Sequence, residues 1–197
     1  MSDPKTLNVY ATQAAEYAAL TDEGATVDPL VQRFISQLPK GGRALDLGCG
    51  PGASAGQMAE AGLLVDAWDP VPEMLELAAR FPGVTTRQAG FGDLTEPDIY
   101  DGIWVNFSML HTPRAAWPTQ LAAIARALRP NGAFYIGTKL GTGEERDKIG
   151  RLYTYVTEGE LMNLMQTAGL KPEFTTRGRD KGLSGEMADW IAVLARG

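Results

Sequence analysis

One glycine-rich stretch restricts the fold of this chain more than any other segment. Residues 44–47 form a short apolar run interrupted by Asp46, and glycines follow at positions 48, 50 and 52 before a helical pattern begins at Ala53. This order predicts a buried strand, a tight turn and the start of a helix. Glycine allows backbone conformations that a Cβ excludes, and the first amides of the helix point into the same space. The stretch therefore predicts a cradle for polar ligand groups.

The composition of the 197 residues is typical of a single domain that buries a sizeable core. No apolar run is long enough to span a bilayer, and the first residues lack the basic-then-apolar layout of a signal peptide. Cys49 is the only cysteine, which excludes an intrachain disulfide and a cysteine cluster for zinc. We therefore expect a cytoplasmic protein without membrane insertion and without a metal site.

The net charge of −6 argues against a large nucleic-acid surface, because such a surface is basic. A small-molecule substrate of either sign remains compatible with this charge. We accordingly expect a small-molecule partner and no nucleic acid. The sequence does not predict an oligomeric state.

The hydrophobic pattern alternates between the two periods that strands and helices require. The predicted helices span residues 5–20, 28–38, 53–61, 71–80, 114–128 and 158–168. The predicted strands span residues 43–47, 63–68, 84–88, 102–106, 133–138, 171–177 and 188–195. Residues 139–155 are polar, glycine-rich and then tyrosine-rich without a clear period, which predicts a loop that acts as a lid.

Alternating strands and helices predict a Rossmann-like, doubly wound α/β fold with a mostly parallel sheet. Only residues 178–187 separate the last two strands, which is too short for a parallel crossover, so we expect an antiparallel hairpin at one edge. We treat residues 1–197 as one domain. Residues 1–40 cap the site, residues 41–138 form the cofactor-binding core, and residues 139–197 supply the lid, a helix and the hairpin.

The loops that follow the first four strands should converge, because ligands bind outside the carboxyl ends of such sheets. Asp69 ends the second strand, twenty-one residues after Gly48, where a carboxylate accepts hydrogen bonds from ribose hydroxyls. The alternative role of Asp69 is to cap the helix that follows Pro70. The spacing favours ribose binding.

The glycine turn is also compatible with a dinucleotide site. Gly48, Gly50 and Ala53 satisfy the dinucleotide fingerprint with alanine at its last position. Two features favour a different ligand: Gly52 adds a third glycine, and Asp46 would repel a pyrophosphate. A carboxylate at that place suits a ligand with an ammonium group.

Several motifs together resemble one enzyme family over most of the chain, from about Tyr10 to Leu194. Residues 46–52 (Asp-Leu-Gly-Cys-Gly-Pro-Gly) resemble the first motif of class I S-adenosylmethionine-dependent methyltransferases, and residues 69–75 resemble the second. Residues 100–111, 128–133 and 189–194 resemble the family's fourth strand, the turn into the fifth strand and the last strand. The likeness is greatest to small bacterial enzymes that act on small molecules.

The resemblance implies a seven-stranded sheet and S-adenosyl-L-methionine as the cofactor, with S-adenosyl-L-homocysteine as the product. Asp69 would hold the ribose, Met74 would pack on the adenine, and Asn106 and Phe107 would lie beneath the methionine portion. The residues that the resemblance assigns to the cofactor are Asp46, Gly48, Cys49, Gly50, Gly52, Asp69, Pro70, Met74, Gly90, Phe91, Asn106 and Phe107. Within this set Cys49 is expected to fill space and not to act as a nucleophile.

The loop after the third predicted strand departs from the family pattern. Gly90 stands where the family often has an aspartate for the adenine amino group. Phe91 can still present its backbone amide and its ring to the adenine. Whether Asp93 replaces the missing carboxylate is left open by the sequence.

Few side chains are candidates for acid–base chemistry or for contact with a substrate. His111 is the only histidine and follows the fourth strand, so it is the candidate catalytic base, although a structural hydrogen-bonding role is the favoured alternative. Tyr10 and Tyr17 lie one helical face apart and either close over the cofactor or pack together. Tyr153 belongs to the candidate lid. Arg151, with its neighbouring cations, is expected on a solvated face.

The sequence therefore predicts methyl transfer from S-adenosylmethionine to an unidentified small molecule by in-line displacement. Two alternatives remain: an NAD(P)-binding oxidoreductase that uses the same glycine turn, and a non-catalytic module that binds S-adenosylmethionine.

Overall fold

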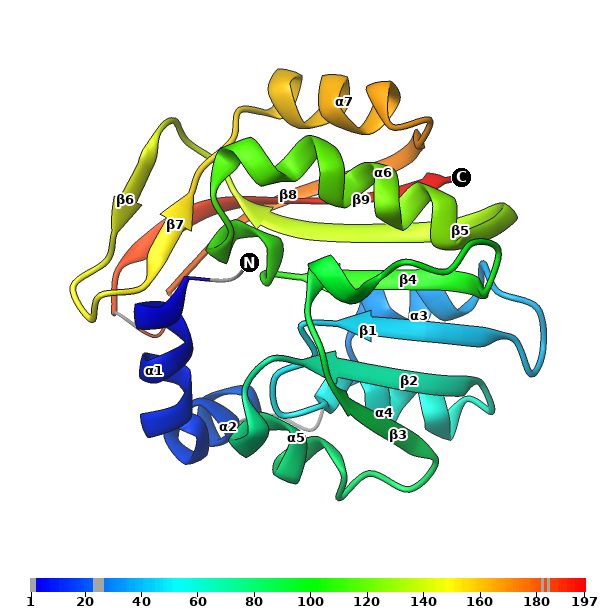
Figure 1. Ribbon diagram of the computed structural model, residues 1–197, viewed down its shortest axis with the longest axis horizontal. Coiled ribbons are helices and arrows are strands. Elements are labelled where there is room, and N and C mark those ends of the chain that lie inside the picture. Colours follow the sequence, from blue (N-terminus) through cyan, green and yellow to red (C-terminus); the bar gives the residue numbers. More distant parts are fainter. Residues whose placement is uncertain (1–2, 23–26, 182, 184) are drawn as a thin grey trace.

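The computed structural model of the chain describes residues 3–22, 27–181, 183 and 185–197. Among these residues, seven strands form one sheet in the order β3-β2-β1-β4-β5-β9-β8 (Figure 1). The strands are β1 Arg43–Leu47, β2 Leu64–Asp69, β3 Val84–Gln88, β4 Tyr100–Asn106, β5 Leu128–Lys139, β8 Lys171–Lys181 and β9 Met187–Arg196.

The pairing directions of the strands confirm the predicted fold class. Strands β1 to β5 are mutually parallel, whereas β9 runs antiparallel to both β5 and β8. The strand order reverses between β1 and β4, so their loops diverge there and leave room for a ligand at their carboxyl ends. β5 begins earlier than predicted, because Leu128 already pairs with Tyr100 before a register shift at Gly102.

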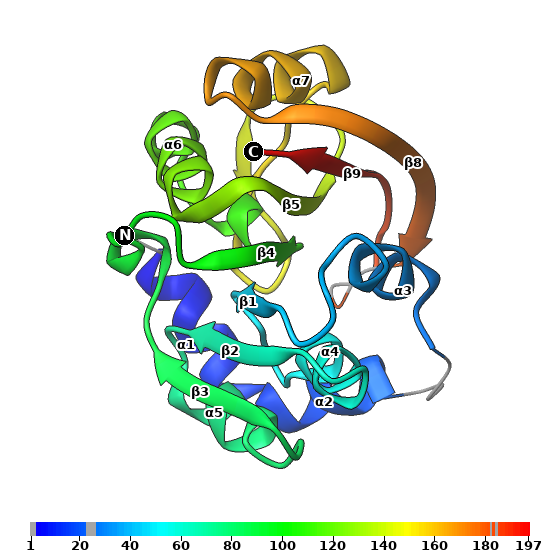
Figure 2. The ribbon, with the colours of Figure 1, turned by 90° about the vertical axis from the view of Figure 1, so that its right-hand side faces the viewer.

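Helices cover both faces of the sheet (Figure 2). Helices α3 (Pro29–Ile35) and α4 (Ala53–Glu60) lie on one face, and α6 (Trp117–Ala127) and α7 (Glu158–Thr167) lie on the other. Each pair closes its own apolar cluster, with Phe34 and Met58 in the first and Leu121 and Leu161 in the second. Burial of these apolar faces provides most of the driving force for assembling the layers.

Two of these helices begin at a side-chain cap. The Asp28 carboxylate accepts a hydrogen bond from the Leu30 amide at 2.8 Å, with Pro29 in the first turn of α3. The Thr157 hydroxyl accepts one from the Glu160 amide at 3.2 Å at the start of α7. Such caps satisfy amides that have no partner within the helix.

The N-terminal segment differs from the single helix predicted over residues 5–20. Two helices, α1 (Pro4–Thr12) and α2 (Ala14–Asp22), meet at Gln13, whose ψ of 18° is outside the helical range. The break lets Tyr10 and Tyr17 meet edge to face, with ring centroids 5.3 Å apart. Together with α5 (Pro72–Ala78), these helices enclose a small apolar cluster. In Figure 1, α1 stands opposite the carboxyl ends of the parallel strands.

The prediction of a loop over residues 139–155 was wrong in part. It contains a two-stranded antiparallel hairpin, β6 (Glu144–Arg146) with β7 (Leu152–Thr154). The hairpin packs beside the short 3₁₀ helix η2 (Met109–His111). The sequence gives no apolar alternation here because the buried side chains include polar ones, such as Thr154 and Arg151. Two further 3₁₀ turns are η1 (Phe91–Asp93) and η3 (Arg114–Ala116).

The described part of the chain contains no helix that is both long enough and apolar enough to cross a membrane.

Candidate functional site

The glycine turn between β1 and α4 has a left-handed backbone at all three glycines, with φ of 78° at Gly48, 52° at Gly50 and 89° at Gly52. The first glycine is also required by packing, since a Cβ there would lie 2.3 Å from the Cβ of Ser108. A Cβ on Gly50 would meet only the Tyr17 ring, at 3.5 Å. The backbone of Gly50 is therefore the part of the turn that a ligand can approach.

Asp69 joins the glycine turn to the second strand. Its Oδ1 accepts a hydrogen bond from the Val71 amide and its Oδ2 accepts one from the Gly50 amide, both at 2.9 Å. Neither bond caps α5, whose N-cap residue is Val71 without a side-chain cap, so the capping alternative from the sequence was wrong. A carboxylate has about four acceptor positions, so these two bonds leave room for ribose hydroxyls. Burial raises the pKa of Asp69 to about 6, against the lowering effect of the two amides.

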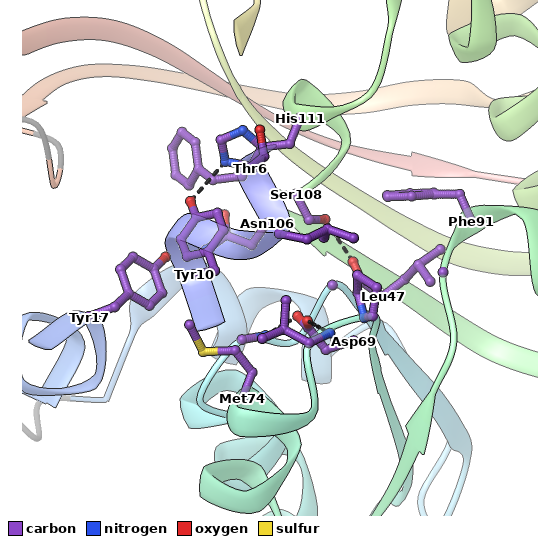
Figure 3. Close-up of a pocket in the computed structure, with 17 residues that line it drawn as sticks. Thr6, Tyr10, Tyr17, Leu47, Asp69, Met74, Phe91, Asn106, Ser108 and His111 are labelled. Atoms are coloured by element: carbon purple, nitrogen blue, oxygen red, sulfur yellow. Dashed lines mark hydrogen bonds between the residues drawn. The ribbon is translucent and has the colours of Figure 1, made fainter. Parts of the chain in front are cut away.

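Two adjoining cavities open around this turn, with volumes of about 80 Å³ and about 640 Å³. Tyr17, Gly48, Gly50 and Asn106 line both of them. The smaller cavity lies between α1, the turn and the ends of β2 and β4 (Figure 3). The larger one extends toward α3 and α4.

Most of the site residues predicted from the sequence lie together at these cavities. The smaller cavity is lined by Gly48, Gly50, Asp69, Pro70, Met74, Gly90, Phe91, Asn106, Phe107, His111, Tyr10 and Tyr17. Asp46 and Cys49 line the larger one. Two predicted residues line neither cavity. Gly52 sits against Ala78 of α5, where a Cβ would be 2.7 Å away, and Tyr153 is buried beside His111 with ring centroids 4.9 Å apart.

Asp46 is a buried carboxylate at the edge of the larger cavity and is 2% exposed. The Ala55 amide donates to it, but its Oδ2 has no hydrogen-bond partner among the described residues. Burial, together with the nearby charge of Asp69, raises the pKa of Asp46 to about 8. Because an unpaired buried carboxylate is costly, this oxygen suits a cationic ligand group such as an ammonium.

The end of β4 has a strained backbone beside the cavity. Phe107 adopts a left-handed conformation with φ of 50°, which is unfavourable for a bulky side chain. Its amide bonds to the Gly137 carbonyl at 2.9 Å, and the Ser108 hydroxyl donates to the Leu47 carbonyl at 2.7 Å. These two bonds hold the end of β4 against β5 and β1, and they place Asn106 and Phe107 at the cavity wall.

Among the described residues, Asp69 is the one carboxylate that lines the smaller cavity, so none of them replaces the missing aspartate at the corner predicted for the adenine. Asp93 accepts a hydrogen bond from the Gly90 amide at 2.8 Å and is exposed outside the two cavities. The wall there is formed by Phe91, by Met74, which is 2% exposed, and by Val71. This corner therefore offers a planar ligand an apolar surface that includes the ring of Phe91.

His111 is buried, and both of its ring nitrogens are occupied. Its Nδ1 lies 2.7 Å from the Leu152 carbonyl oxygen and its Nε2 lies 2.8 Å from the Tyr10 hydroxyl (Figure 3). Burial, together with the nearby charge of Arg151, lowers the pKa of His111 to about 4. The ring is therefore neutral at physiological pH.

Arg151 is not on a solvated face, contrary to the prediction from the sequence. Its side chain is 2% exposed and pairs with Asp147 at 2.7 Å, and its Nη1 donates to the Tyr10 hydroxyl at 2.8 Å. The misleading signal was the run of cations around it, which is usually a solvent-facing pattern. Arg151 itself lines neither cavity. The residues of the smaller cavity that sequence analysis did not assign to the site are Thr6, Leu7, Leu47, Val71 and Ser108.

Comparisons with known proteins agree with the motifs and the fold. A family model described as a methyltransferase domain matches residues 44–132. The cypemycin N-terminal methyltransferase of a Streptomyces species is 34% identical over 143 residues, which are 69% of this chain and 57% of that protein. The chain thus spans a little more than half the length of this relative.

Solved structures share the fold over nearly the whole chain. One is the 1,6-didemethyltoxoflavin N1-methyltransferase of Burkholderia thailandensis, solved with 1,6-didemethyltoxoflavin and S-adenosylhomocysteine bound. It has a TM-score of 0.80 and 27% identity, and the match covers 98% of this chain and 87% of that one. A methyltransferase of Methanosarcina mazei has a TM-score of 0.74 and 17% identity, covering 86% of this chain and 97% of the other.

The glycine turn, the strand order and these relatives agree with one another. The chain therefore belongs to the class I S-adenosylmethionine-dependent methyltransferases, a family whose cofactor is S-adenosylmethionine.

Proposed function

We propose that this chain transfers the methyl group of S-adenosylmethionine to a nitrogen atom of a small molecule. The observation that carries the proposal is the pair of joined cavities around Gly50, with Asp69 at one side and the unpartnered oxygen of Asp46 at the other. The names of the two relatives above 25% identity support a nitrogen acceptor, since one is an N-terminal and the other an N1-methyltransferase.

The residues present fit the cofactor's chemical groups. Asp46 supplies a negative charge for the ammonium group, and Asp69 supplies acceptor positions for the ribose hydroxyls. Met74, Val71 and Phe91 supply an apolar wall for the adenine. When bound, the cofactor supplies a methyl group on a positively charged sulfur. The sulfur needs no activation by the protein, so we assign these residues to positioning, which contributes roughly 7–11 kcal/mol in favourable cases.

Binding of S-adenosylhomocysteine tests the cofactor site directly. At about 100 times its dissociation constant the ligand adds roughly 2.7 kcal/mol of stability, which corresponds to a rise in melting temperature of about 5–11 °C for a chain of this size. Asp69→Asn keeps an acceptor for the Val71 amide, and we expect it to remove most of the shift. Asp66→Ala, on the same strand but paired with Arg43, is the matched control and should keep the full shift.

The outcome also decides between the functions that the sequence left open. A shift with NADH and none with S-adenosylhomocysteine would support an oxidoreductase and contradict the proposal. An unchanged shift in Asp69→Asn would remove the ribose role assigned to this residue.

The acceptor atom is tested with S-adenosylmethionine that carries an isotopically labelled methyl group. The enzyme is incubated with separate pools of nitrogen heterocycles, primary amines, peptides with free N-termini, phenols and thiols. We expect labelled N-methyl products from a nitrogen-containing pool. Labelled methyl only on oxygen or sulfur would contradict the nitrogen assignment, and cofactor binding without any product would favour the non-catalytic module.

A further inference from the structure

A buried polar cluster joins three segments that are far apart in the sequence. Tyr10 comes from α1, His111 from η2, and Arg151 from the residue before β7. The guanidinium of Arg151 makes two hydrogen bonds to Asp147, at 2.9 Å and 2.7 Å, and both side chains of this ion pair are at most 5% exposed. A buried ion pair seldom adds stability over apolar packing, so its position beside a ligand cavity points to a role in the reaction.

The direction of every hydrogen bond in this cluster follows from the groups involved. The Leu152 carbonyl can only accept, so Nδ1 of His111 carries the proton and donates. In the neutral ring Nε2 is then a lone-pair acceptor, and the Tyr10 hydroxyl donates to it. A guanidinium can only donate, so Arg151 donates to the Tyr10 oxygen.

This arrangement decides which side chain is able to meet a substrate. Tyr10 and His111 both line the smaller cavity. Both nitrogens of His111 are already used, whereas the Tyr10 oxygen donates one bond, accepts one from Arg151 and keeps one acceptor position. The free acceptor position therefore lies on Tyr10.

We propose that the Tyr10 hydroxyl is the catalytic group that meets the acceptor nitrogen, with His111 behind it as the proton acceptor and Arg151 as the residue that positions it. This inference rests on the proposed function and adds an acceptor class: a nitrogen that carries at least one hydrogen while it is methylated.

The proton step conserves atoms and charge. As the acceptor nitrogen gains the methyl group, its N–H bond breaks, the bonding electrons stay on nitrogen, and the proton moves to the Tyr10 oxygen. The original Tyr10 O–H bond breaks in the same event, and that proton moves to Nε2 of His111. The imidazolium then passes its proton to water, which its lowered pKa favours. The positive charge that leaves the sulfur thus ends on the solvent.

The groups around the pair keep both the tyrosine and the histidine uncharged at rest: burial raises the pKa of Tyr10 well above its ordinary value and lowers the pKa of His111 to about 4. Those that face it from the neighbouring elements are Tyr17, Lys139, Asp147, Arg151 and Tyr153. Arg151 lies beside both members: it donates to the Tyr10 oxygen and lowers the pKa of His111.

Nuclear magnetic resonance of the imidazole nitrogens tests the cluster without a known substrate, because His111 is the only histidine. In the nitrogen-labelled wild-type protein we expect a neutral ring with its proton on Nδ1, which titrates near pH 4. Tyr10→Phe and Arg151→Gln should each move the titration toward the ordinary value of 6.5. Lys148→Gln, which removes an exposed cation of the same hairpin that pairs with Glu186 and not with α1, is the matched control and should change neither signal.

Two further measurements keep the test decisive. Arg151→Gln leaves Asp147 unpaired, so the double variant with Asp147→Asn provides a neutral cluster. It should titrate above the wild type but below Arg151→Gln, because Asp147 raises the pKa of His111. With the acceptor found above, Tyr10→Phe should keep the full thermal shift with S-adenosylhomocysteine but lose roughly 100-fold or more in turnover.

The results separate this inference from the proposed function. A proton on Nε2 in the wild type, an equal response to Lys148→Gln, or full turnover in Tyr10→Phe would overturn the proton path and leave cofactor binding intact. Failure to bind S-adenosylhomocysteine would overturn the proposed function, while the imidazole spectra would still report the hydrogen-bond directions.

Discussion

At the scale of single residues, the site depends on charges that are buried without full compensation. Asp46 is the clearest case, because one of its oxygens has no partner in the described structure and its neighbour Asp69 carries like charge. A ligand-free fold that keeps such a carboxylate loses stability at this position. The loss is recovered when a cation binds, which couples the ionisation of Asp46 to cofactor binding.

Asp46→Asn should therefore stabilise the ligand-free protein in a pH-dependent way. The folded pKa of about 8 lies above the ordinary 3.8, so the wild type loses stability as pH rises from about 4 to about 8. Asparagine cannot ionise, and the variant escapes this loss. We expect its melting temperature to exceed that of the wild type most at pH 8, with little difference at pH 4. A difference of the same size at every pH would contradict this ionisation.

At the scale of elements, α1 covers the smaller cavity and is fastened to the β6–β7 hairpin by polar contacts. Asp3 bonds to Arg146 through both carboxylate oxygens at 2.8 Å, and the Thr6 hydroxyl accepts from the Leu152 amide at 2.8 Å. Arg151, the residue before β7, also donates a hydrogen bond to the Tyr10 hydroxyl. The position of α1 thus sets the distance between Tyr10 and the site. Disturbing the junction between α1 and the hairpin therefore moves α1 and Tyr10 together.

Thr6→Val tests this junction, because valine has nearly the same shape and no hydroxyl. Thr6 is 1% exposed, and the change leaves the Leu152 amide without its partner at a cost of about 1–3 kcal/mol. The melting temperature should fall by about 2–12 °C, and the Leu152 amide should exchange hydrogen faster. Thr12→Val, on the same helix but exposed and bonded only within it, should change the stability by less than about 0.5 kcal/mol. Equal losses in both variants would contradict the junction.

At the scale of the whole molecule, the net charge of −6 is reflected in the site. The described residues that line the two cavities include Asp28, Asp46, Glu60 and Asp69 but no lysine or arginine. The buried cation Arg151, which bonds to Tyr10 of the smaller cavity, is paired with Asp147. The field inside the site therefore favours a positively charged ligand.

This field should distinguish the cofactor from its product. S-adenosylmethionine carries a sulfonium charge that S-adenosylhomocysteine lacks, so its affinity should weaken more as the ionic strength rises from about 0.01 M to about 1 M. Calorimetric titration of both ligands at the two ends of this range measures the effect. An equal salt dependence for both ligands would show that the sulfur lies outside the field of these carboxylates.

Much of the fold was predictable because it depends on short-range patterns. The apolar runs and the glycine turn predicted the parallel part of the sheet. The short connection at residues 178–187 predicted the antiparallel pairing of β8 with β9. The hairpin inside residues 139–155 was not predictable, since it buries Arg151 and Thr154. Their burial is made possible by partners elsewhere in the chain, and no local period encodes such partners.

The candidate site divides in the same way. The sequence by itself determined the cradle, because the conformation of Gly48 and Gly50 and the position of Asp69 follow from local backbone chemistry and strand spacing. Only the tertiary structure decided which side chains lie over that cradle. The Tyr10 hydroxyl meets His111 across 101 positions and Arg151 across 141. Contacts at such separations depend on how the layers pack, because packing fixes which distant side chains share a buried polar neighbour.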